Sequence, residues 1–240
     1  MNDAALLDLW EAAWPLAPSP RAQLLARAGG AADDAGPGQR NDAVLRLRSQ
    51  ICGPALRLRA CCPGCATDLE FEIDSGALPA PGSSTHDAVH ELQHGPIRVR
   101  FRAPRTDDLD AVAAPGRTDD TFAAARALFE RCIVDARVDG RAIDAAELGA
   151  DVRQAVADAL DAADPLASLA FDLACPACAT RFDAPLDLAG VTFAELRHRA
   201  EGVLADVATL AQAYGWREHE VLALTPLRRA AYLQLAGADG

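Results

Sequence analysis

The stretch CCPGC, residues 61–65, decides how this chain folds, together with the sequence that surrounds it, LRLRACCPGCATDLEFEID (56–74). Leucine alternates with arginine before the cysteines, and apolar residues alternate with acidic ones after them. A period of two predicts half-buried β-strands. Because the arginines of one strand would face the carboxylates of the other, we expect an antiparallel hairpin with the cysteines at its tip.

A second stretch, LACPACATRFDAPLD (173–187), repeats this pattern of strand, cysteine turn and strand. Both stretches contain Cys-Pro-x-Cys followed by Ala-Thr. Structural zinc takes four thiolate or imidazole ligands, commonly supplied as two closely spaced pairs. The sequence therefore predicts one structural zinc ion per chain, with the ligands Cys62, Cys65, Cys175 and Cys178.

The separation of the two pairs departs from an ordinary zinc ribbon. There are 109 residues between Cys65 and Cys175, against about 12 to 20 in the usual spacing. Such a gap is tolerable, because the entropic cost of closing a loop grows only logarithmically with its length. We therefore expect a ribbon whose two halves are split by a long insertion.

Other roles for the cysteines remain open at this point. The two hairpins could pack together without metal, and Cys61 could replace Cys62 as a ligand. A redox dithiol is disfavoured because neither pair begins a helix, where thiolates are activated. A catalytic zinc site is disfavoured because no histidine and carboxylate cluster with a general base flanks either pair. Cys52 and Cys132 fall in helical patterns and are expected to be small core residues.

The predicted fold class is α+β, with helical N- and C-terminal parts around a small antiparallel β core of the two cysteine hairpins. Helical periodicity covers residues 4–14 and 192–214, and Thr225-Pro226 is a typical helix start. The expected segments are an N-terminal helical segment (1–53), a first knuckle with β-strands (54–105), an acidic helical insertion (106–165), a second knuckle (166–191) and a C-terminal helical unit (192–240).

The negative charge of the chain is concentrated in its middle. The formal net charge is −12, and residues 106–192 hold 7 Arg against 17 Asp and Glu. An acidic protein repels phosphate backbones unless a local basic face overrides the repulsion. A nucleic acid partner is therefore not expected, although a basic stripe could come from Arg57, Arg59, Arg98, Arg100 and Arg102.

Two further patterns could carry chemistry but have simpler interpretations. His86, His90 and His94 recur every four residues, as a metal-binding triad on a helix would, but an exposed polar loop or helical turn is the favoured interpretation. The arginines of IRVRFR (97–102) could grip an anion, but they are expected to form the outer face of a strand or to pair with the acidic segment. We find no phosphate-binding glycine loop or nucleophile elbow, and no catalytic residue is assigned.

The order of motifs resembles a known family. The helix LLDLWEAAW (6–14), the two cysteine stretches and the ending VATLAQAYGWREHEVLALTPLRRAAYLQL (207–235) are similar to proteins encoded among contractile tail genes, akin to phage baseplate hub assembly chaperones. The C-terminal part is the most specific, since short tail and baseplate proteins share a Tyr-x-Trp then Arg-Arg-x-x-Tyr pattern.

This resemblance implies a non-enzymatic assembly factor or a minor structural component of a contractile baseplate. Its partners would be tail and baseplate proteins, with no small-molecule substrate and no membrane. Trp216, Arg228, Arg229 and Tyr232 are the candidate partner-binding residues, because Trp, Tyr and Arg are enriched at interface hot spots; packing within the C-terminal unit is the alternative. The start of the chain lacks a signal-peptide pattern, so we expect a cytoplasmic location or incorporation into a tail-like particle. A nucleic-acid-associated zinc ribbon and a thiol redox enzyme are the competing functions.

Overall fold

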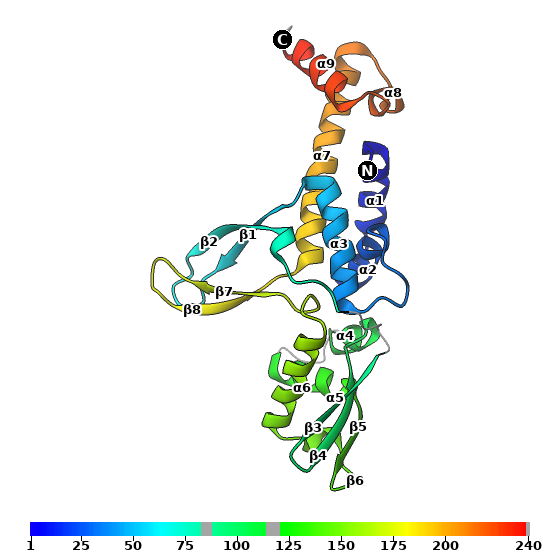
Figure 1. Ribbon diagram of the computed structural model, residues 1–240. Helices are drawn as coiled ribbons and strands as arrows, with labels where there is room; N and C mark the ends of the chain where they lie inside the picture. The colour runs from blue at the N-terminus through cyan, green and yellow to red at the C-terminus, as the bar shows by residue number, and fades with distance from the viewer. Residues whose placement is uncertain (83–87, 114–120, 239–240) are drawn as a thin grey trace.

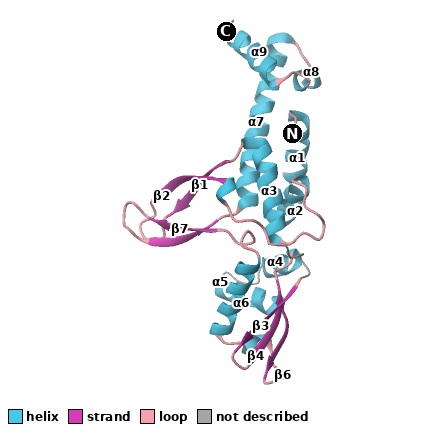
Figure 2. Cartoon of the chain, in the orientation of Figure 1, coloured by secondary structure: helices cyan, strands magenta, loops and turns pink. Residues whose placement is uncertain are grey.

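The computed structural model describes residues 1–82, 88–113 and 121–238. It confirms an α+β fold, with helices at both ends of the chain and small antiparallel sheets between them (Figures 1 and 2). The helices are α1 (Asp3–Ala13), α2 (Pro18–Ala28), α3 (Pro37–Cys52), α4 (Thr106–Ala113), α5 (Thr121–Cys132), α6 (Ala150–Ala163), α7 (Leu188–Tyr214), α8 (Glu218–Leu222) and α9 (Pro226–Ala238). The strands are β1 (Ala55–Cys61), β2 (Asp68–Asp74), β3 (Val89–His94), β4 (Ile97–Arg102), β5 (Ile133–Val138), β6 (Arg141–Ala142), β7 (Ala170–Ala174) and β8 (Arg181–Pro185).

A helical body forms around the long helix α7, against which α1, α2 and α3 pack. Its core includes Leu25, Leu47 and Leu196, which are almost fully buried. Burying such a side chain contributes about 1.5–3 kcal/mol. The helices therefore gain their stability by facing one common core, which joins the N-terminal part of the chain to the C-terminal part.

Two separate hairpins project from the side of this body (Figure 1). In the first, β1 pairs with β2, and Arg57 and Arg59 lie opposite Glu72 and Glu70 as the charge pattern predicted. In the second, β7 pairs with β8. The hairpins contact each other through Phe71 and Phe171, whose rings meet edge to face with centroids 5.5 Å apart.

The insertion between the hairpins has a hydrophobic core of its own. Strands β3, β4, β5 and β6 form one antiparallel sheet, and α6 packs on it through Val152 and Val156 against Val99 and Phe101. The expected grouping of residues 54–105 with the first knuckle therefore differs from the structure. Strands β3 and β4 belong with the insertion, because they pair with β5 and not with the cysteine hairpins.

The carboxylate of Asp164 links the insertion to the helical body. Asp164 follows the last residue of α6, and its two oxygens accept hydrogen bonds from the backbone N–H groups of Gly38 and Gly82, each at 2.7 Å. A Cβ atom added at either glycine would lie closer than van der Waals contact to Asp164 or its neighbour. These glycines allow the chain entering the insertion, the chain leaving it and the start of α3 to meet at one point.

Candidate metal centre

Each cysteine pair lies in a tight turn that closes its hairpin. In the first turn the N–H of Cys62 donates to the carbonyl of Thr67 at 2.9 Å, and the N–H of Ala66 donates to the carbonyl of Cys62 at 2.8 Å. The backbone of Ala66 is left-handed, with φ of 57°, a conformation that costs a non-glycine residue about 1–2 kcal/mol. The turn thus holds a mildly strained residue directly after its second cysteine.

The second turn repeats this geometry residue by residue. The N–H of Cys175 donates to the carbonyl of Thr180, and the N–H of Ala179 donates to the carbonyl of Cys175, both at 2.9 Å. Ala179 is again left-handed, with φ of 59°. The weak sequence repeat is therefore a true structural repeat, and the same strained position recurs in it.

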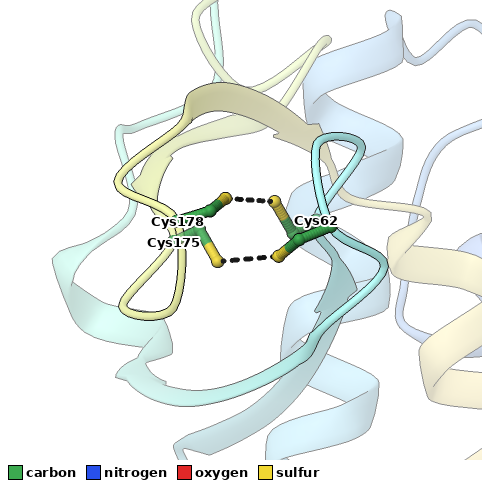
Figure 3. A group of neighbouring side chains, drawn as sticks. Cys62, Cys175 and Cys178 are labelled. Atoms are coloured by element: carbon green, nitrogen blue, oxygen red, sulfur yellow. Dashed lines mark hydrogen bonds between the residues drawn. The ribbon is translucent and has the colours of Figure 1, made fainter.

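The two turns bring four sulfur atoms together. The Sγ atoms of Cys62, Cys65, Cys175 and Cys178 all lie within 4.8 Å of one another. Across the gap, Cys62 faces Cys178 (Figure 3). Cys65 faces Cys175 in the same way, and both distances between sulfurs are 3.6 Å. Four sulfurs bound tetrahedrally at about 2.3 Å from a zinc ion would be about 3.8 Å apart. The spacing of the cluster is compatible with a metal site of this kind.

The four cysteines differ in their exposure, in a regular way. The first cysteine of each pair, Cys62 or Cys175, is buried, and the second, Cys65 or Cys178, is exposed. Cys61 lies outside the cluster on β1 and is exposed. The geometry therefore selects Cys62 over Cys61 as the member of the cluster, a choice that the sequence left open.

Hydrogen bonds lower the pKa of some of these thiols, and burial raises the pKa of another. The Sγ of Cys178 lies 3.3 Å from the hydroxyl oxygen of Thr180, and hydrogen bonding from Thr180 lowers the pKa of Cys178 to about 6. Thr67 likewise lowers the pKa of Cys65. Burial raises the pKa of Cys62 to about 11. A cation at the centre of the cluster would favour the thiolate form of that buried residue as well.

Thr67 and Thr180 are site residues whose role was not predicted from the sequence. The signal was the repeated Ala-Thr after each second cysteine. In the structure, the hydroxyl of each threonine lies against the sulfur of the exposed cysteine two residues earlier.

The histidine pattern has a different structural basis from a helical triad. His90 and His94 lie on strand β3 and not on a helix, and His86 is outside the described residues. His90 stacks on Phe101 with ring centroids 5.7 Å apart, and His94 Nε2 lies 3.3 Å from a carboxylate oxygen of Asp151. Spacing by four does not bring side chains together on a strand, and within the described residues the four cysteines are the one group arranged to hold a metal.

The predicted partner-binding residues lie near the end of α7, where Trp216 and Tyr232 belong to an aromatic cluster and the two arginines differ in burial. Trp216 stacks on Tyr214 and meets Tyr232 edge to face, with ring centroids 4.9 and 4.8 Å apart. Arg229 is buried and forms ion pairs with the rest of the helical body, whereas Arg228 is exposed. Contacts within the protein therefore hold Arg229, whereas Arg228 is accessible to a partner.

Comparison of the chain with protein-family models, with curated proteins and with solved structures gave no match. Among the described residues, none of the helices has the length and apolar character that a membrane span requires. The site alone thus defines a class, a split ribbon with a four-cysteine candidate metal centre.

Proposed function

We propose that this chain is a non-enzymatic assembly factor or minor structural component of a contractile, phage-tail-like baseplate. It acts by binding tail proteins: one zinc ion held by Cys62, Cys65, Cys175 and Cys178 fixes the two hairpins, and helical surfaces of the chain hold the partner. The observation that carries the structural role of the metal is the cluster itself, in which four protein sulfurs lie within 4.8 Å of one another.

A four-thiolate set favours structural zinc over catalytic zinc. Catalytic zinc usually keeps one position open for water and has three protein ligands, whereas structural zinc is closed by four. Binding of zinc to such sites contributes about 10–16 kcal/mol in zinc-finger peptides at neutral pH. This is enough to hold together two hairpins whose cysteine pairs have 109 residues between Cys65 and Cys175.

The baseplate setting is supported by the resemblance of the C-terminal motif to short tail and baseplate proteins. In this chain the motif forms an aromatic cluster of Tyr214, Trp216 and Tyr232 at the end of a 27-residue helix. A cluster held at the end of a long rigid helix is well placed to be presented to a partner.

Charge pairing disfavours the nucleic-acid alternative. Arg57 and Arg59 contact Glu72 and Glu70 with N–O distances of 3.1 and 2.6 Å, and Arg102 pairs with the buried Asp108. Phosphate-binding stripes present uncompensated positive charge. The same arginines here lie beside carboxylates, as is common at protein–protein interfaces.

The test is affinity capture from cells that co-express the tail genes of the same cluster. We expect the tagged wild-type chain to retain at least one tail or baseplate protein, and the Cys62→Ser/Cys175→Ser variant to lose it. A tagged protein of similar acidity serves as the control. Capture of no tail protein by the metal-loaded wild-type chain would contradict the proposal.

A further inference from the structure

Strand β1 has one free edge, and the hydrogen-bond pattern identifies its residues. The hairpin bonds that bracket β1 run from the N–H of Ser75 to the carbonyl of Pro54 and from the N–H of Cys62 to the carbonyl of Thr67. In an antiparallel pair such bonded residues alternate with residues whose backbone groups point away. The even-numbered residues of β1 therefore face β2, and the N–H and carbonyl groups of Arg57 and Arg59 point outward.

This outward edge faces the helical body. Ala55 is odd-numbered like Arg57 and Arg59, so its backbone groups also point outward. Its carbonyl accepts a hydrogen bond of 2.5 Å from Arg48 on α3. Arg48 in turn contacts Glu195 on α7. In the parts of the chain that the structure describes, no strand other than β2 pairs with β1. The edge groups of Arg57 and Arg59 thus lie beside a helix without a strand partner on that side.

A groove runs between this edge and helix α7, with a volume of about 850 Å³. A third strand would lie about 4.8 Å from β1, so the groove has room for an extended segment. The groove is lined by Arg48, Cys52, Ala55, Arg57, Arg59, Ala194, Glu195, His198 and Arg199.

The charge of this groove is opposite to that of the whole chain. Four arginines and one glutamate line it, whereas the formal net charge of the protein is −12. Three of these arginines already contact one carboxylate each, Arg48 that of Glu195, Arg57 that of Glu72 and Arg59 that of Glu70. The same alternation of inward and outward backbone groups identifies the outward residues of the other hairpin strands. Those of β2 include Glu70 and Glu72, β7 presents Asp172, and β8 presents Arg181 and Asp183 and ends in Pro185, which has no N–H. The edge of β1 presents two arginines and no carboxylate among its outward residues.

We propose that the free edge of β1 receives an extended, acidic segment of a partner protein as a third strand. This inference rests on the proposed function, since it names the surface and the chemistry by which a partner binds. Backbone hydrogen bonds to Arg57 and Arg59 provide affinity, as in other cases of strand addition. Carboxylates at alternate positions of the segment face the two arginine side chains, whose guanidinium groups have donors left for a second carboxylate. Small apolar residues at the positions between fit beside Ala194.

The test uses a fluorescein-labelled octapeptide of alternating Glu and Val, with fluorescence anisotropy measured on the metal-loaded chain. Arg57→Pro removes one outward N–H and the guanidinium of Arg57, but leaves every backbone hydrogen bond between β1 and β2 in place. We expect this variant to bind the peptide at least about tenfold more weakly than wild type. Ala170→Pro, which alters the outward edge of β7, is the matched control and should bind as wild type does.

Charge reversal provides a second arm in case the proline variant does not fold. Arg57→Glu/Arg59→Glu should lose the Glu-Val peptide while retaining the metal of the wild-type chain. Equal binding of a Lys-Val peptide, unchanged binding by both groove variants, or no binding by the wild-type chain would overturn the inference. So would self-association of the chain through this edge, visible as a dimer that Arg57→Pro dissociates.

The outcome can be separated from that of the proposed function. If Arg57→Pro captures tail proteins as well as wild type does, the docking edge is wrong and the baseplate function stands. If the wild-type chain binds the Glu-Val peptide through Arg57 but captures no tail protein, the docking edge stands and the baseplate function is wrong.

Discussion

Asp108 is a buried carboxylate that three separate groups hold in its charged form. Its oxygens accept hydrogen bonds from the guanidinium of Arg102 at 2.5 and 3.2 Å, from the backbone N–H of Arg105 at 2.9 Å and from the guanidinium of Arg131 at 3.0 Å. These donors, Arg102 first, lower the pKa of Asp108 to about 2. One residue of α4 thereby joins β4 to the end of α5.

This contact gives the insertion a defined pH dependence. The pKa of Asp108 is about 2 in the folded chain against an ordinary value of 3.8, so its stabilisation is present above pH 4 and disappears as the pH falls through about 2. A shift of this size corresponds to about 2 kcal/mol. We expect Asp108→Asn to destabilise the insertion by about this amount at pH 7 and to lose this effect as the pH falls through about 2.

Hydrogen exchange of the β4 and α5 backbone amides measures that difference. Asp135→Asn is the control, because Asp135 pairs with Arg137 at a more exposed position and should matter far less. Equal destabilisation by the two variants at pH 7 would show that the Asp108 cluster has no special role.

At the scale of the elements, Arg229 fastens α9 to two other helices. Its guanidinium lies 2.6 Å from a carboxylate oxygen of Asp3 on α1 and 3.2 Å from one of Asp206 on α7. The residue is only 7% exposed. Breaking a buried ion pair leaves its remaining charges desolvated. The first turn of the chain and its last helix therefore stabilise each other through this side chain.

Substituting the two neighbouring arginines separates stability from binding. We expect Arg229→Gln to lower the free energy of unfolding by about 1–3 kcal/mol, less than for a fully buried pair because Asp206 is partly exposed. Arg228→Gln, at an exposed position, should leave stability unchanged but weaken capture of the tail partner. Urea unfolding followed by tryptophan fluorescence, to which Trp10, Trp14 and Trp216 contribute, measures the first effect, and equal unfolding midpoints for the two variants would refute it.

The sequence predicted local elements better than their long-range partners. The helix starting after Thr225 and the pairing of Arg57 and Arg59 with acidic residues are confirmed, because caps and charges act on near neighbours. The helix expected from residue 192 begins at Leu188, where Asp187 caps it. Strands β3 and β4 were grouped with the wrong unit because their partner β5 lies far along the chain, and a β-bulge between Arg100 and Phe101 shifts its register. Sequence periodicity does not show which distant strands pair or in which register.

The candidate metal site was predicted more fully than the fold around it. All four clustered cysteines were named from their spacing, since chemistry restricts thiolate ligands to few arrangements. The sequence could not decide between Cys61 and Cys62, because that choice depends on which residue of the turn points inward. Nor could it predict that Arg229 would be buried, since Asp3 and Asp206 lie far from it in the chain.

For the molecule as a whole, the described residues form two hydrophobic cores, one in the helical body and one in the insertion. The body core draws on both ends of the chain, while the described residues of the insertion core lie between β3 and α6. The two ends of the insertion meet where Gly82 donates to Asp164 at 2.7 Å. The insertion is thus arranged as a unit added into an otherwise continuous ribbon.

Removal of the insertion should leave the rest of the protein folded. We expect a variant in which a short Gly-Ser linker replaces residues 88–163 to unfold cooperatively and to bind as much metal as the full chain. Because the insertion ends are adjacent, the linker closes the chain at little entropic cost. Circular dichroism and metal analysis of the purified variant provide the check, and a variant that is unfolded in the presence of zinc would show that the cores depend on each other.

We propose that two cysteine pairs, with 109 residues between Cys65 and Cys175, hold one metal ion between them. The zinc content per chain tests this directly, measured by mass spectrometry on purified wild-type protein and on the Cys62→Ser, Cys175→Ser and Cys61→Ser variants. We expect about one zinc per wild-type chain, loss of the metal in either of the first two variants, and retention in Cys61→Ser. Two zinc ions per chain, or full retention in Cys62→Ser or Cys175→Ser, would contradict it.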